Sequence, residues 1–148
     1  MSAVEPRREE PARVASTASG PGRLVVAVYA VLALAATARS TVQIARDLGA
    51  APLAYLLSAV AGVVYVLATV ALARGGPGWR RVAWAAVGTE AVGVLVVGGL
   101  SLAAPDLFPD ATVWSGFGEG YGFVPLVLPW VGLWWLARTR PRPAQPAG

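Results

Sequence analysis

An acidic residue in the middle of an apolar segment is the side chain of this sequence best placed to do chemistry. Glu90 lies nine residues beyond Arg81, within the otherwise uncharged segment VAWAAVGTEAVGVLVVGGLSL. At about 1.5 Å per helical residue it lies about 14 Å from Arg81, close to the midplane of a hydrocarbon core about 30 Å thick. An ionised carboxylate at that depth costs at least about 2.5 kcal/mol. We therefore expect Glu90 to be neutral, paired, or open to a wet cavity.

Two uses of Glu90 are consistent with this depth. As a functional group it would bind a proton or a cation. As a structural group it would hold two helices together through a hydrogen bond, which is a common role of polar residues in membrane proteins. Both uses remain open at this point.

A column of polar residues marks the far end of the first apolar segment. Arg39, Gln43 and Asp47 recur every four residues, so one face of a helix would carry all three. Arg39 lies sixteen residues beyond Arg23, about 24 Å along the helix and in the outer third of the membrane. At that depth its guanidinium either extends outward to the lipid headgroups, which fixes register and orientation, or pairs with a carboxylate.

Three carboxylates are candidate partners of Arg39. An ion pair with Glu90 would be stretched, because the two estimated depths differ by about 10 Å. Asp110 or Glu119 of the long loop is an equally good partner if the loop folds into the bundle. Together with Gln43, the residues Arg39 and Glu90 form a candidate polar site within the membrane.

Glycine and aromatic residues alternate in the segment WSGFGEGY, from Trp114 to Tyr121. The spacing is not that of a dinucleotide or phosphate loop, because no strand precedes it. Amphipathic aromatics beside glycines at a membrane boundary are typical of an interfacial or re-entrant segment, which would fold over the outer mouth of a helix bundle. The candidate outer-loop site consists of Glu119, Asp110, Trp114 and Tyr121.

The residues needed for most enzymatic and metal sites are missing. The chain contains no cysteine and no histidine, which excludes thiolate catalysis, disulfides and the usual zinc, haem and copper ligand sets. The loop acids Asp106, Asp110 and Glu119 have no metal-ligand spacing around them. We therefore expect a protein that is not an enzyme and that binds no cofactor and no metal.

The composition indicates a polytopic membrane protein. Of the 148 residues, 56% are hydrophobic and 14% are charged, with a mean hydropathy of +0.59, whereas a soluble domain has roughly 25% charged residues. Four apolar segments are candidates for membrane-crossing helices, and the flanking ends are expected to be disordered cytoplasmic tails. The helices cover residues 24–44, 53–73, 82–102 and 123–137, and the tails cover residues 1–23 and 138–148. The predicted fold is an all-α bundle of four transmembrane helices.

The placement of arginines predicts the orientation. Ten of the twelve arginines would lie on the side of the two termini and of the loop around residues 74–81, and the opposite side carries four acids. By the positive-inside rule both termini are cytoplasmic, and the longer loop between the third and fourth helices is extracytoplasmic, in a multi-pass protein of the cell inner membrane. The arginines form no basic face with interleaved aromatics, so we expect no binding to nucleic acid.

One alternative changes the number of helices. The motif ATA at residues 36–38 follows an apolar run and resembles a signal-peptidase site, so cleavage there would remove residues 1–38 and leave three helices. A signal peptide normally has a short cationic start, whereas this run follows a long tail of mixed charge. The apolar pattern also continues beyond Arg39. Both features favour an uncleaved first helix.

Small residues spaced by four predict close contacts between helices. The candidates are Ser58 and Gly62 on the second helix, and Ala85, Thr89 and Gly93 on the third. Glu90 would point about 100° away from the small residues of the third helix. It would either flank their contact or face a neighbouring crevice.

Three stretches carry a resemblance to a group of known proteins. They are ATARSTVQ at residues 36–43, APLAYLLSAV at residues 51–60 and LFPDATVWSGFGEGYGFVPLVLP at residues 107–129. On these stretches the chain resembles small, uncharacterised four-helix integral membrane proteins of high-GC actinobacteria, over residues 24–137. The resemblance implies the four-helix fold and transfers no catalytic residue.

Two functions fit these features. The first is a non-enzymatic scaffold or accessory subunit of a membrane complex, whose polar seam and glycine loop receive a partner. The second is a small oligomeric transporter or proton-coupled permeation unit that uses Glu90 and Arg39. The expected partners are the lipid bilayer and either another membrane protein or further copies of the chain. A cavity that joins Glu90 and Arg39 would favour transport, whereas burial of both in helix contacts would favour the scaffold.

Overall fold

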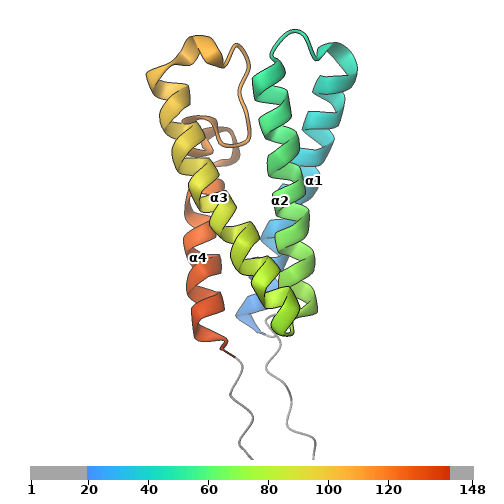
Figure 1. The fold of residues 1–148 in the computed structure, drawn as a ribbon, viewed down its shortest axis with the longest axis vertical. Helices are drawn as coiled ribbons and strands as arrows, with labels where there is room; N and C mark the ends of the chain where they lie inside the picture. The colour runs from blue at the N-terminus through green and yellow to red at the C-terminus, as the bar shows by residue number, and fades with distance from the viewer. Residues whose placement is uncertain (1–19, 141–148) are drawn as a thin grey trace, which may run out of the picture.

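The computed structural model of the protein describes residues 20–140. Within this range the chain folds into four α-helices and three short 3-10 helices, with no strand (Figure 1). The α-helices are α1 (Pro21–Asp47), α2 (Pro52–Arg74), α3 (Pro77–Ala103) and α4 (Val124–Arg138). The 3-10 helices, all between α3 and α4, are η1 (Pro105–Leu107), η2 (Ser115–Phe117) and η3 (Glu119–Tyr121). The prediction of an all-helical chain is confirmed.

The first three helices begin earlier than their apolar segments. Each has a proline in its first turn, at Pro21, Pro52 and Pro77, where the missing N–H would have no helical partner and the fixed φ suits a helix. α1 therefore includes residues that were predicted to belong to the N-terminal tail. At the other end, α4 includes Arg138, which was also predicted to belong to a tail. Gly20, Thr139 and Arg140 are described outside the helices, and the remaining predicted tail residues, 1–19 and 141–148, lie outside the described part of the chain.

α1, α2 and α3 are each long and apolar enough to cross a membrane. The segment of residues 115–121 and α4 satisfy the same criteria only together, and they meet at an angle of 98°. The number of spans is therefore three, or four if this bent pair crosses as one unit. Helices of this length and composition indicate a membrane protein.

The helices form an elongated bundle in which both ends of the described chain lie at the same end (Figure 1). α1 and α2 make an antiparallel hairpin, and α3 crosses the bundle at a tilt with the shorter α4 beside its lower half. After α3 the chain descends between α3 and α2 before α4 begins. α4 thus starts well below the upper end of the bundle.

Close helix contacts occur at some of the predicted small residues. A Cβ at Gly62 would lie 3.0 Å from the Thr37 hydroxyl, so α2 approaches α1 closely at this glycine. On α3 the prediction is wrong for Ala85 and Thr89, which are exposed, whereas Gly93 makes a close contact with Trp114 of the loop. The buried face of α3 is instead the one that carries Glu90. Spacing by four occurs on more than one face of a helix rich in alanine and glycine, and the buried polar residue must face its hydrogen-bond partners.

Candidate functional site

The carboxyl group of Glu90 is sealed in the core of the bundle. Glu90 has no exposed surface, and its Oε2 accepts a hydrogen bond of 2.6 Å from the hydroxyl of Tyr29 on α1. Tyr29 is itself fully buried. Its hydroxyl also lies near Gly132 of α4, where an added Cβ would be 3.1 Å away. The other oxygen of Glu90, Oε1, is buried and has no hydrogen-bond partner among residues 20–140.

Two aromatic residues extend this contact toward the loop between α3 and α4. The ring of Tyr65, on α2, packs against the ring of Tyr29, with 6.3 Å between the two ring centroids. The indole N–H of Trp114 donates a hydrogen bond of 2.9 Å to the Tyr65 hydroxyl, and the two rings meet edge to face. We call Glu90, Tyr29, Tyr65 and Trp114 the buried aromatic column. Its four side chains come from α3, α1, α2 and the loop, so the column joins four segments that are distant in sequence.

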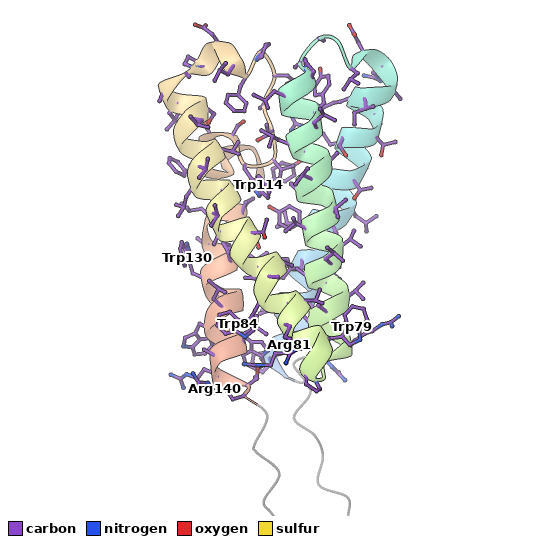
Figure 2. All side chains as sticks on the ribbon, in the orientation of Figure 1. Trp79, Arg81, Trp84, Trp114, Trp130 and Arg140 are labelled. Atoms are coloured by element: carbon purple, nitrogen blue, oxygen red, sulfur yellow. The ribbon has the colours of Figure 1, made fainter. Side chains whose placement is uncertain are left out.

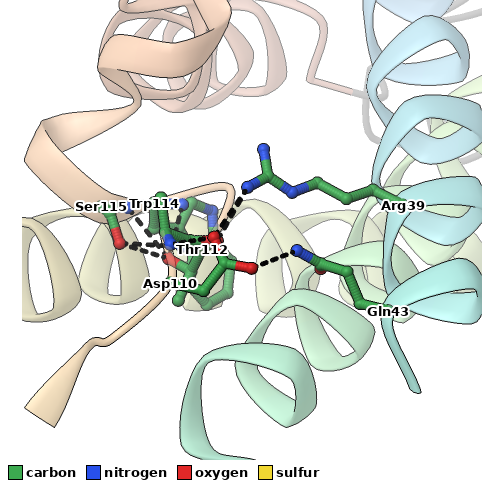
Figure 3. Close-up of polar contacts among 7 residues, drawn as sticks. Arg39, Gln43, Asp110, Thr112, Trp114 and Ser115 are labelled. Atoms are coloured by element: carbon green, nitrogen blue, oxygen red, sulfur yellow. Dashed lines mark hydrogen bonds and ion pairs between the residues drawn. The ribbon is translucent and has the colours of Figure 1, made fainter. Parts of the chain in front are cut away.

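Trp114 reaches the column because the loop backbone is held in a compact turn. The hydroxyl of Thr112 accepts hydrogen bonds from the backbone N–H groups of Trp114 (3.0 Å) and Ser115 (2.9 Å), and the Thr112 N–H donates to the Ser115 hydroxyl (Figure 3). Such side-chain caps are the usual means by which serine and threonine shape turns. The ring of Trp114 then lies against Gly93 of α3, where an added Cβ would be 2.6 Å away. A larger residue at that position would exclude the indole.

A second set of contacts fastens the loop to the upper part of α1. Arg39 donates a hydrogen bond of 3.0 Å from Nη2 to the Ala111 carbonyl, and the same atom lies 3.8 Å from Oδ1 of Asp110. Gln43 donates a hydrogen bond of 3.1 Å to Oδ2 of Asp110 (Figure 3). We call Arg39, Gln43 and Asp110 the loop latch. The Arg39 and Asp110 side chains are 32% and 41% exposed, so their ion pair alone contributes little to stability.

The structure divides the candidate intramembrane polar site into two parts. Arg39 and Gln43 lie together in the loop latch, whereas Glu90 lies in the buried aromatic column. Arg39 therefore contacts Asp110, and the stretched pair with Glu90 does not form. The physical reason is the descending loop, which brings an acid and a carbonyl to the depth of Arg39.

The candidate outer-loop residues are also separated. Asp110 belongs to the latch and Trp114 to the column. Glu119 is exposed, and Tyr121 is partly buried beside α1. These four residues therefore do not form one site.

Sequence reasoning missed Tyr29 and Tyr65. Both lie well inside their apolar segments, while tyrosines of membrane proteins usually lie at the headgroup boundary. A phenol away from the boundary needs a hydrogen-bond partner. The position of the two tyrosines inside their apolar segments therefore indicated buried hydrogen bonds, although it does not identify the hydrogen-bond partner of either hydroxyl.

Two grooves on the surface of residues 20–140 are lined by neither Glu90 nor Arg39. One groove, on the outside of α1 and α2, is lined by residues that include Thr37, Ser40 and Val63. A second lies between α1 and the start of α4. It is lined by Ala27, Val28, Val31, Leu32, Tyr121 and Val124, and we call it the α1–α4 groove.

The described residues offer no obvious centre for metal chemistry. Between residues 20 and 140 no group of three or more acidic, cysteine or histidine side chains could hold a metal ion. The hydroxyl and carboxyl groups of the column can donate or accept hydrogen bonds, and the carboxyl group of Glu90 can hold a proton. The latch can position a loop.

Charged and aromatic residues gather at the end of the bundle where the described chain begins and ends. Trp79, Arg81, Trp84 and Arg140 lie there (Figure 2). The guanidinium group of Arg74 stacks over the Trp79 ring, with its Cζ 5.2 Å from the ring centroid. Such collars are typical of the boundary between a membrane and water.

Comparison with known proteins found no relative: the chain matches no protein-family model, no curated protein and no solved structure.

Proposed function

We propose that the protein is a non-enzymatic scaffold or accessory subunit of a membrane complex. The main support is that the three residues of the candidate intramembrane polar site, Glu90, Arg39 and Gln43, each contact another part of the chain. Glu90 is sealed against Tyr29, and Arg39 fastens the loop. Neither lines one of the grooves described above. Polar contacts of this kind commonly join helices in membrane proteins.

The proposal includes four spans, with α1 uncleaved and both termini in the cytoplasm of a bacterial inner membrane. It is supported by the position of both described chain ends at one end of the bundle, where the arginine and tryptophan collar also lies (Figure 2). It is also supported by α1, which runs unbroken through residues 36–38 and packs along α2. This arrangement makes the loop after α3 extracytoplasmic.

The absence of cysteine from the sequence permits a clean test of this topology. Single cysteines at Gly78 and at Asp106 can be labelled in intact cells with a membrane-impermeant maleimide. We expect labelling at position 106 and not at position 78. Labelling at position 78 alone would reverse the orientation.

The accessory role is tested by extracting the full-length protein from native membranes in a mild detergent. We expect it to migrate in a complex with a defined second membrane protein, because an accessory subunit stays bound to its partner. A control extraction in a harsh detergent should release the chain. Recovery as a lone monomer in the mild detergent would contradict the proposal.

One observation favours a second function, a small transporter or proton-coupled permeation unit that uses Glu90 and Arg39. Oε1 of Glu90 is buried without a partner among the described residues, and intramembrane acids often mark proton paths. The test is proton flux into liposomes that contain the wild-type chain or a Glu90→Gln variant. Flux that the substitution abolishes would support transport, and unchanged flux would exclude this use of Glu90.

A further inference from the structure

Positive charge is concentrated at the end of the bundle where the described chain begins and ends, which we call the arginine end (Figure 1). The five acids of residues 20–140 lie elsewhere, in the last turn of α1, in the middle of α3 and in the loop after α3. All the arginines of these residues except Arg39 and Arg46 lie at the arginine end. They are Arg23, Arg74, Arg80, Arg81, Arg138 and Arg140.

The segments of the chain that adjoin the arginine end bring no net negative charge. Residues 1–19 contain three glutamates and three arginines, and residues 141–148 contain one arginine and no acid. The adjoining segments therefore cannot neutralise the arginines of the four helix ends. Their counter-charge has to come from outside the chain.

The arginines at the junction of α3 and α4 come from both helices. Arg80 donates hydrogen bonds to the backbone carbonyls of Leu136 and Thr139, which holds the start of α3 beside the end of α4. Arg81 and Arg138 are exposed. Within residues 20–140 no arginine at this end forms an ion pair. The junction therefore presents cations from two helices to the surroundings.

Tryptophans place these arginines at the depth of the lipid headgroups. Trp84 of α3 and Trp134 of α4 are 40% and 53% exposed, and tryptophan in membrane proteins is enriched at this boundary. The Cζ of Arg138 lies 4.9 Å from the centroid of the Trp134 ring. Stacking uses the face of the guanidinium group and leaves the N–H donors at its edge available. That edge can bind two phosphate oxygens at once.

The distribution of these residues favours lipid over a single macromolecule as the ligand. Figure 2 shows Trp79 and Arg140 on opposite sides of the arginine end, with Arg81 and Trp84 between them. Lipids surround a membrane protein, whereas a partner protein covers one side of it. Anionic headgroups supply the missing negative charge, whereas zwitterionic headgroups have no net charge. Each arginine near an anionic membrane surface strengthens binding by about five-fold.

We propose that the arginine end binds anionic phospholipids in preference to zwitterionic ones, through exposed arginines that include Arg81 and Arg138. The proposal does not depend on the accessory role. It gives these arginines a ligand in addition to their part in setting the orientation of the chain.

The proposal is tested with the full-length chain in phosphatidylcholine bilayers. A fixed fraction of the lipid is replaced by brominated phosphatidylglycerol or, in a parallel sample, by brominated phosphatidylcholine. Bromine quenches tryptophan fluorescence on contact, so the two quenching curves give the relative affinity for the two lipids. We expect a preference for phosphatidylglycerol of at least about five-fold, the value for one arginine. High salt should reduce the preference, because it screens charges at the membrane surface.

Single substitutions locate the binding surface. Arg81→Gln and Arg138→Gln should each lower the preference by up to about five-fold. Arg46→Gln is the matched control, because it removes the same charge from an exposed residue at the opposite end, beside Asp47, and it should leave the preference unchanged. Each variant is measured with both brominated lipids, so a change in the fluorescence of Trp134 itself cancels. Thermal denaturation in detergent verifies that the variants are folded.

Three outcomes would overturn the proposal. The first is equal quenching by the two brominated lipids. The second is a preference that survives both Arg81→Gln and Arg138→Gln, or that Arg46→Gln lowers as much. The third is a purified chain without lipid preference from which Arg81→Gln releases an acidic protein during extraction from native membranes, since the arginines would then serve a protein.

Discussion

The hydrogen bond between Tyr29 and Glu90 can be tested by removing one oxygen atom. Tyr29→Phe keeps the ring and its packing but leaves Oε2 of Glu90 without its donor in a fully buried position. An unsatisfied buried acceptor costs about 1–3 kcal/mol. Interhelical hydrogen bonds in membrane proteins average about 0.6 kcal/mol and reach about 1.7. We expect a loss of about 1–2 kcal/mol, because both partners are sealed from water.

The assay is equilibrium unfolding in mixed micelles of dodecyl maltoside and SDS, followed by the fluorescence of the six tryptophans. A double-mutant cycle with Glu90→Leu isolates the contact. In the Glu90→Leu background, Tyr29→Phe should cost about 1 kcal/mol less than in the wild type, because no carboxylate is left unpaired. Tyr121→Phe, at a partly buried tyrosine, serves as the control and should change stability by less than about 0.5 kcal/mol. Equal costs in the two backgrounds would refute the coupling.

Three further predictions concern the loop and the bundle ends. Asp110→Asn should lower the free energy of global unfolding by less than about 1 kcal/mol, but it should speed hydrogen exchange of the backbone amides in the loop latch. Unchanged exchange there would contradict the role of the latch. Gly98→Ala places a Cβ 2.5 Å from the Phe117 ring and should cost about 1–3 kcal/mol in mixed micelles. Gly99→Ala, with open space around the added methyl group, should raise the free energy of unfolding by up to about 1 kcal/mol. If the two alanine substitutions changed stability equally, the close packing of Phe117 against Gly98 would be contradicted. Arg80→Gln removes donors to the last carbonyls of α4 and should cost about 0.5–2 kcal/mol, so an unchanged unfolding midpoint would exclude that role.

The helices could be predicted from the sequence because their apolar segments are long and their breaks contain glycine and proline. Arg39 and Gln43 could be placed on one face by their spacing. Asp110 was one of three candidate partners for Arg39, and the choice depended on how far the loop descends. Hydropathy does not contain that information.

The partner of Glu90 could not be predicted in the same way. Tyr29 is 61 residues distant in sequence, and the contact depends on the rotation of two helices about their axes. The small-residue pattern suggested the wrong rotation for α3, as the exposed Thr89 shows. Trp114 was expected in an interfacial or re-entrant segment at the outer mouth of the bundle, and Gly93 leaves space for its ring inside the bundle.

The central claim is that the polar groups of this chain hold the fold together while the chain serves a partner protein. Extraction from native membranes directly into polymer-bounded nanodiscs, followed by native mass spectrometry, tests it most directly. The account predicts a particle that contains the 15.2 kDa chain and a different membrane protein in a fixed ratio. Particles that contain only this chain would contradict it.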